Sequence, residues 1–147
     1  MDTFVDDIRK SFNLGESDVR SYSPLVLAYI GDSVYEVIIR TLLADGVGGT
    51  VQKLHKKATK YVKASAQAFI ITALFDELTE EEQDVCKRGR NAKSHKAPKN
   101  GSIGEYHRAT AFEAVIGYLF LKNDNERILY IVKKGIEMID ANEAESL

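Results

Sequence analysis

The sequence has few of the residues that stabilise small secreted or metal-bound domains. Its single cysteine, Cys86, cannot form an internal disulfide, and no Cys/His cluster has the spacing of a structural zinc site. Proline and glycine are not enriched, and no run of about 18 apolar residues occurs, so neither extensive disorder nor a membrane-spanning helix is expected. The N-terminal stretch MDTFVDDIRK is acidic and lacks the apolar core of a signal peptide. These absences favour a reduced cytoplasmic setting without a membrane partner.

The 147 residues, 44% of them hydrophobic, suffice for one domain with a sizeable core. The periodicity is helical throughout, and no alternating strand pattern exceeds four residues. We therefore expect an all-α fold of about six to seven helices, with its core in about residues 22–140 and polar tails that fray. The expected helices are 24–44, then 51–61, 64–77, 80–87, 106–122 and 126–141. Apolar residues surround the first of them, so we expect it to be buried on nearly all sides.

Several helix starts have capping signals. Ser23 precedes Pro24 at a first helical position, and Thr50 precedes the second helix. Thr79 with Glu82, and Asn123 with Glu126, have the spacing of helix caps. GVGG at 46–49 ends the first apolar helix, whereas 88–105 lacks hydrophobic periodicity and is expected to be a loop.

Positive charge is concentrated in two segments, although the net charge is only −2. Residues 50–63 and 87–99 hold 11 of the 20 lysines and arginines and no acid. Lys53, Lys56, Lys57 and Lys60 recur at roughly helical spacing, and both segments are typical of a nucleic-acid-binding face. The alternative is an ordinary solvated charged surface. The candidate phosphate-contacting residues around the loop are Arg88, Arg90, Asn91, Lys93, Lys96, Lys99, Tyr106 and Arg108.

Two carboxylates interrupt the most apolar helices. Asp32 shares a helix face with Ala28 and Glu36, and Glu113 is the only acid between Glu105 and Asp124. A buried carboxylate needs a partner or a metal, and oxygen ligands of this kind suit Mg²⁺. The alternative is a structural role for Asp32, paired with Arg40 or Arg108. We expect Gly31 and Gly117 to let their two helices pack closely.

The motifs resemble those of a known family. LAYIGDSVYE is similar to the ribonuclease III signature helix, roughly L-E-F-L-G-D-[AS]-V-L, and TAFEAVIGYLFL resembles that family's second motif, D-x-x-E-A-L-I-G. Together with KRGRNAKSHKAPKN, the pattern is closer still to the small bacterial Mini-ribonuclease III branch, and it covers about residues 24–135. Asp32 and Glu113 match two of the family's four acids, whereas Ala28 and Thr110 stand where the other two are expected.

The resemblance implies the ribonuclease III endonuclease-domain fold, a homodimer, and a single catalytic domain over 1–147 without a double-stranded-RNA-binding domain. It implies an endoribonuclease that hydrolyses phosphodiesters of double-stranded RNA, acting in maturation of the 23S ribosomal RNA precursor. Asp32 and Glu113 would be catalytic ligands of Mg²⁺, which Mn²⁺ can replace, and water, Glu36 or Thr110 would complete the shell. Two rivals stay open: a non-catalytic double-stranded-RNA-binding protein that keeps the fold, and a helical interaction domain in which both acids are structural.

Overall fold

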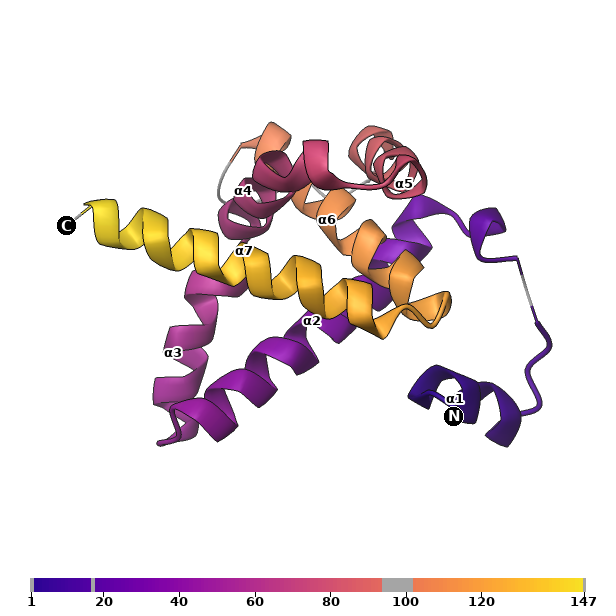
Figure 1. Ribbon diagram of the computed structural model, residues 1–147, viewed down its shortest axis with the longest axis horizontal. Coiled ribbons are helices and arrows are strands. Elements are labelled where there is room, and N and C mark those ends of the chain that lie inside the picture. The colour runs from indigo at the N-terminus through magenta and orange to yellow at the C-terminus, as the bar shows by residue number, and fades with distance from the viewer. Residues whose placement is uncertain (1, 17, 94–101, 147) are drawn as a thin grey trace.

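The computed structural model describes residues 2–16, 18–93 and 102–146, and all regular structure within them is helical (Figure 1). Seven α-helices and two 3₁₀ turns follow one another along these parts of the chain. Their bounds are α1 Phe4–Ser11, η1 Val19–Ser21, α2 Pro24–Gly46, α3 Val51–Val62, α4 Ala64–Leu74, η2 Phe75–Glu77, α5 Glu80–Asn91, α6 Ile103–Leu121 and α7 Asn125–Ser146. The all-α class and the expected number of helices are confirmed.

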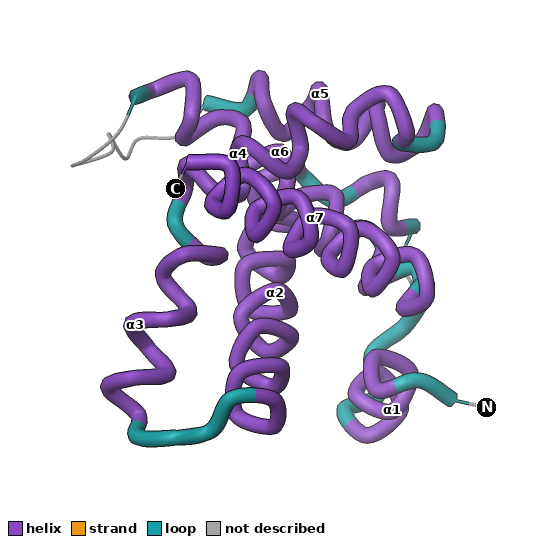
Figure 2. The backbone as a smooth tube through the Cα atoms, turned by 60° about the vertical axis from the view of Figure 1, so that its left-hand side comes forward, coloured by secondary structure: helices purple, strands orange, loops and turns teal. Residues whose placement is uncertain are grey.

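Helix α6 forms the centre of the molecule. It packs against α2, α4 and α5, and α7 lies across α4 and α6 (Figures 1 and 2). The side chains of Phe112, Val115 and Ile116 are fully buried, and apolar residues surround the helix instead of forming one stripe. Such a helix belongs in the middle of a core. Glu113 is therefore carried by the most enclosed element of the fold.

Two glycines bring α2 and α6 into backbone contact. A Cβ atom on Gly31 would lie 1.8 Å from the carbonyl oxygen of Glu113, and one on Gly117 would lie 1.9 Å from the carbonyl oxygen of Leu27. No side chain fits at either position, so the expectation of close helix packing at this glycine pair is confirmed. Because Asp32 directly follows Gly31, this crossing fixes where its carboxylate lies relative to α6.

Most of the expected helix starts are also confirmed. The side chains of Ser23 and Thr50 accept hydrogen bonds from the third backbone N–H of their helices, at 3.2 and 3.3 Å. Thr79 and Glu82 form a reciprocal capping box at the start of α5. Local side-chain chemistry was sufficient to locate these boundaries because each cap satisfies backbone groups that the helix itself leaves unpaired.

The expected boundary of the 88–105 loop was wrong at both ends. Helix α5 continues to Asn91, and α6 already begins at Ile103, after a capping box formed by Ser102 and Glu105. The reason at the first end is packing: a Cβ on Gly89 would lie 2.9 Å from the Cα of Ala111, so this glycine lets α5 approach α6. Residues 94–101 of the loop lie outside the described part of the chain.

The last helix also differs from the expectation. Asp124 caps α7 by accepting a hydrogen bond from the backbone N–H of Arg127 at 3.2 Å, whereas Asn123 adopts a left-handed φ of 67° after the end of α6. The expected cap at Asn123 was therefore wrong. The helix continues to Ser146 instead of fraying after Asn142, and Lys60 of α3 forms ion pairs with Asp140 and Glu143 near its end.

Helix α1 was not expected from the sequence. It lies against the turn between α6 and α7, where Arg9 donates a hydrogen bond to the carbonyl oxygen of Leu121 at 3.1 Å. The amide of Asn123 donates to Asp6 at 2.9 Å and also pairs with the Thr3 hydroxyl. These are contacts between distant parts of the chain, so local sequence patterns gave little indication of them.

An ion pair joins α5 to α7. Glu82 is 3% exposed, and the Arg127 guanidinium donates to its two carboxylate oxygens at 2.8 and 2.9 Å. Burial raises the pKa of the Glu82 carboxyl, but the bonds from Arg127 and from the Thr79 N–H outweigh it, so the pKa lies below its ordinary value. The pair holds the N-terminal end of α5 in place.

Candidate active site

The structure brings Asp32 of α2 and Glu113 of α6 together. Asp32 is exposed, whereas Glu113 is half-buried. Both are placed by the glycine crossing, because α2 approaches α6 at Gly31, with the Glu113 carbonyl at the point of contact. The site therefore has one carboxylate at the surface and one behind it.

This proximity changes the ionisation of Glu113. Burial, together with the neighbouring Asp32 carboxyl, raises the pKa of Glu113 from 4.5 to about 9. An interaction with the Gln67 side chain opposes the rise, and the charge of Glu36 adds to it. At neutral pH the metal-free pair therefore holds a proton, because two carboxylates in contact cannot both be charged without compensation.

The two residues expected to complete the metal shell, Thr110 and Glu36, already have hydrogen-bond partners. The Thr110 hydroxyl donates to the carbonyl oxygen of Tyr106 at 3.0 Å on its own helix. Glu36 accepts a hydrogen bond from Arg40 at 3.2 Å. Arg40 was one of the two residues considered as an ion-pair partner for Asp32. It is paired instead with Glu36, which lies one helical turn after Asp32.

Gln67 of α4 is the residue near this pair that sequence reasoning missed. It is 4% exposed, and its amide nitrogen donates to the carbonyl oxygen of Val62 at 3.0 Å. Its amide oxygen is buried and has no hydrogen-bond partner among the residues that the structure describes. The signal in the sequence was a single polar residue within the apolar run ASAQAFII.

The available donors fit one kind of metal ion. Among residues 2–16, 18–93 and 102–146, no three His, Cys, Asp or Glu side chains converge to form a metal cluster. The two carboxylates offer oxygen donors alone, which suits Mg²⁺ because that ion binds one or two carboxylates and keeps several waters. The Gln67 side chain, which interacts with Glu113, adds an amide oxygen without a partner to the surroundings of the pair. Zinc, which prefers nitrogen and sulfur ligands, does not fit.

The candidate phosphate-contacting residues fall into distinct environments. Arg88 is half-buried and donates to the carbonyl oxygen of Tyr22 at 3.2 Å, so it ties α5 to the start of α2. Tyr106 is half-buried with its ring edge-on to that of His107. The exposed members near the end of α5 and the start of α6 are Arg90, Asn91, Lys93 and Arg108. Lys96 and Lys99 lie outside the described residues.

The lysines of α3 are only partly available. Lys53, Lys56 and Lys57 are exposed, whereas Lys60 is engaged with Asp140 and Glu143 of α7. In both views α3 and the C-terminal end of α7 lie on the same side of the molecule (Figures 1 and 2). The exposed positive charge of α3 is therefore concentrated toward its N-terminal half.

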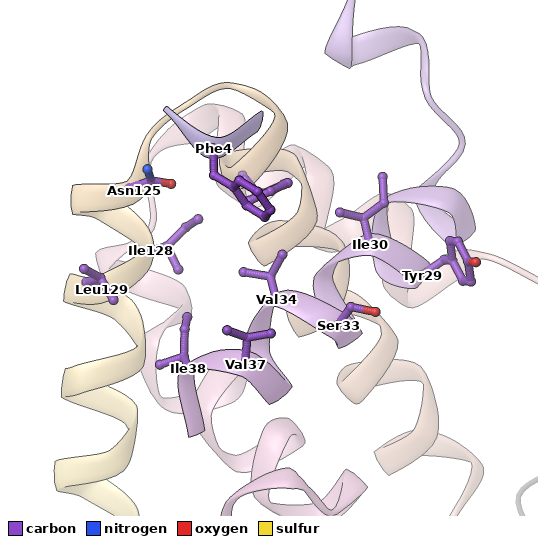
Figure 3. A pocket seen from close by; sticks show the side chains of 11 residues that line it. Phe4, Tyr29, Ile30, Ser33, Val34, Val37, Ile38, Asn125, Ile128 and Leu129 are labelled. Atoms are coloured by element: carbon purple, nitrogen blue, oxygen red, sulfur yellow. The ribbon is translucent and has the colours of Figure 1, made fainter. Parts of the chain in front are cut away.

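An apolar groove runs along α2, and its existence corrects the expectation that this helix is buried on nearly all sides. The groove encloses about 560 Å³ between α2, α7 and the Phe4 ring of α1 (Figure 3). Val34 and Val37 line it from α2, and Ile128 and Leu129 line it from α7. Tyr29 at its end is 80% exposed and Val37 is 64% exposed.

Comparison with known proteins identifies the family. Residues 25–124 match the ribonuclease III domain. The chain is 48% identical to Mini-ribonuclease 3 of Clostridium tetani, over 95% of this chain and 97% of that protein. It is 38% identical to Mini-ribonuclease 3 of Staphylococcus aureus, over 87% and 97%. The chain belongs to the Mini-ribonuclease 3 branch of the ribonuclease III family. It is therefore a ribonuclease III-type endoribonuclease, and the family resemblance of its motifs is confirmed.

The fold comparison agrees with this assignment. A crystal structure of a protein from Fusobacterium nucleatum superposes with a TM-score of 0.75 at 34% sequence identity, covering 83% of this chain and 98% of that one. The ribonuclease III fold is thus shown by both sequence and structure. Within this Mini-ribonuclease 3 chain, the described helices include none long and apolar enough to cross a membrane.

Proposed function

We propose that this endoribonuclease hydrolyses phosphodiester bonds of double-stranded RNA at a metal site whose protein ligands are Asp32 and Glu113. The observation that carries the proposal is the contact between these two carboxylates, imposed by the backbone crossing at Gly31. Holding two acids together is unfavourable for the metal-free protein, and a divalent cation removes that cost. The matching motif positions of the family support the same assignment.

Asp32 and Glu113 would have different roles at this site. Asp32, which is exposed, is open to a phosphate at the surface, whereas Glu113 is half-buried behind it. A bound Mg²⁺, or Mn²⁺ in its place, supplies an activated water and stabilises charge on the phosphate. As the family resemblance implies, the products carry 5′-phosphate and 3′-hydroxyl ends.

The RNA duplex would contact the positive residues around the C-terminal end of α5 and the start of α6. The exposed Arg90, Lys93 and Arg108 support this placement, with Lys96 and Lys99 proposed as further contacts from outside the described residues. A-form RNA presents its phosphates and a wide minor groove, so recognition would follow shape more than base sequence. We propose that the residues of this domain bind the duplex directly.

The biological role that follows from the resemblance is maturation of 23S ribosomal RNA in the cytoplasm. A homodimer would place two such sites on one duplex. The groove along α2 supports dimerisation, because exposed apolar surface of this kind marks interaction sites. The groove and the exposed Tyr29 ring lie on the same face of the chain. In a two-fold dimer, the Tyr29 ring of each chain can therefore fill the groove of the other.

The experiment is cleavage of a long RNA duplex in Mg²⁺ by the wild type and by the Asp32→Asn and Glu113→Gln variants. Both variants should cut far more slowly than the wild type, by more than the roughly 100-fold that losing a supporting residue costs. Asp45→Asn, an exposed acid at the far end of α2, is the matched control and should cut normally. EDTA should stop cleavage and leave duplex binding intact. Undiminished cleavage by Asp32→Asn, or cleavage in EDTA, would contradict the proposal.

A further inference from the structure

The acid pair supplies two protein ligands, whereas the family motifs have four acids. Ala28 and Thr110 occupy positions where the family motifs have acids, and neither side chain is charged. The Thr110 hydroxyl is bonded within α6, and Glu36 is paired with Arg40. The residue that completes the site must therefore be sought outside the two motifs.

Gln67 has the properties that these candidates lack. It belongs to α4, which packs directly against α6, and its side chain interacts with Glu113. In the part of the chain that the structure describes, its amide oxygen is the one buried side-chain polar atom without a hydrogen-bond partner. Buried polar atoms are nearly always satisfied, so an exception beside a pair of carboxylates calls for a functional reason.

The conformation of Gln67 is fixed independently of any ligand. Its amide nitrogen donates to the carbonyl oxygen of Val62, next to the junction between α3 and α4. That bond settles which end of the amide is the donor, because the oxygen could not face another carbonyl oxygen. The side chain is thus held in place by its own hydrogen bond.

We infer that Gln67 completes the cation site: its buried amide orients Glu113 and supplies the neutral oxygen donor that Ala28 and Thr110 do not. The inference rests on the proposed function, since it assigns a role toward the cation held by Asp32 and Glu113. A neutral amide adds an oxygen donor without adding a third negative charge to an already repulsive pair. It also extends the site to a third helix, α4.

The test is the affinity of the RNA-free protein for Mn²⁺, measured by the electron paramagnetic resonance signal of the free ion. Gln67→Met keeps the volume of the side chain but removes the amide, and it should weaken Mn²⁺ binding by about tenfold or more. Gln67→Glu adds a charge beside Glu113 and should strengthen binding. The matched control is Gln83→Met, because Gln83 also donates its amide N–H to a backbone carbonyl, that of Phe75 at 2.9 Å.

The outcomes separate the two proposals. Mn²⁺ affinity within twofold of wild type in both Gln67 variants, with Asp32→Asn impaired, would overturn the role of Gln67 and leave the proposed function standing. No Mn²⁺ binding by the wild type beyond that of Asp32→Asn would overturn the metal site itself. If Gln67→Met does not melt cooperatively, Gln67→Glu decides: tighter binding supports the inference, and equal or weaker binding overturns it.

Discussion

At the scale of single residues, the ionisation of Glu113 links the site to stability. The pKa of this carboxyl is raised from 4.5 to about 9 in the folded chain, by burial and by Asp32. Between these two pH values the folded chain holds a proton that the unfolded chain has lost. Stability rises with pH only where the unfolded state binds more protons, so here the free energy of unfolding falls as pH increases.

We therefore expect the metal-free protein to lose thermal stability between about pH 6 and about pH 9 in EDTA, through this one group. Glu113→Gln cannot ionise at this position, so its unfolding temperature should fall less steeply over the same range. Thermal melts of both proteins, followed by circular dichroism, make the comparison. Parallel curves for wild type and variant would show that Glu113 does not titrate as the geometry requires.

The acid pair could be found from the sequence, whereas Gln67 could not. Asp32 and Glu113 each interrupt an apolar helix, and a charge in such a place needs an explanation. Their neighbouring glycines indicated how the two helices meet. A lone glutamine in a helix has no such signal, because its significance depends on α4 packing against α6 and on an oxygen left without a partner.

At the scale of helices, the positive end of α5 is the element that we expect to bind RNA. Replacing Arg90 and Lys93 together by alanine should weaken duplex binding and lower the slope of log affinity against log salt by about one for each phosphate that the variant no longer neutralises. The control pair is Lys10 and Lys133, exposed on α1 and α7, whose replacement removes the same charge elsewhere. Fluorescence anisotropy over a salt series, in EDTA to prevent cleavage, measures both slopes.

If the Arg90 and Lys93 variant binds with the affinity and salt slope of the control pair, the end of α5 is not the RNA face. The exposed lysines of α3 would then be the next surface to test.

Helix boundaries followed from the sequence only where the cause was local. The caps at Ser23, Thr50 and Thr79 were found because a side chain bonds to its own helix. The end of α5 was missed because glycine is typical of loops, whereas Gly89 is explained by tertiary packing against Ala111. Helix α1 was missed because its anchors, such as the bond from Arg9 to Leu121, join distant residues.

At the scale of the whole molecule, the face along α2 is the surface that we expect to form the proposed dimer. The helix was expected to be buried on nearly all sides, but within this chain Val37 and Tyr29 are exposed and line a groove. We predict that the wild type sediments as a dimer at micromolar concentration, and that Val37→Lys sediments as a monomer because the charge would be buried in the interface. Val51→Lys, at a valine on α3 that is 77% exposed, is the control and should stay dimeric. Analytical ultracentrifugation distinguishes these states; a monomeric wild type, or a dimeric Val37→Lys variant, would mean that this face does not form the dimer.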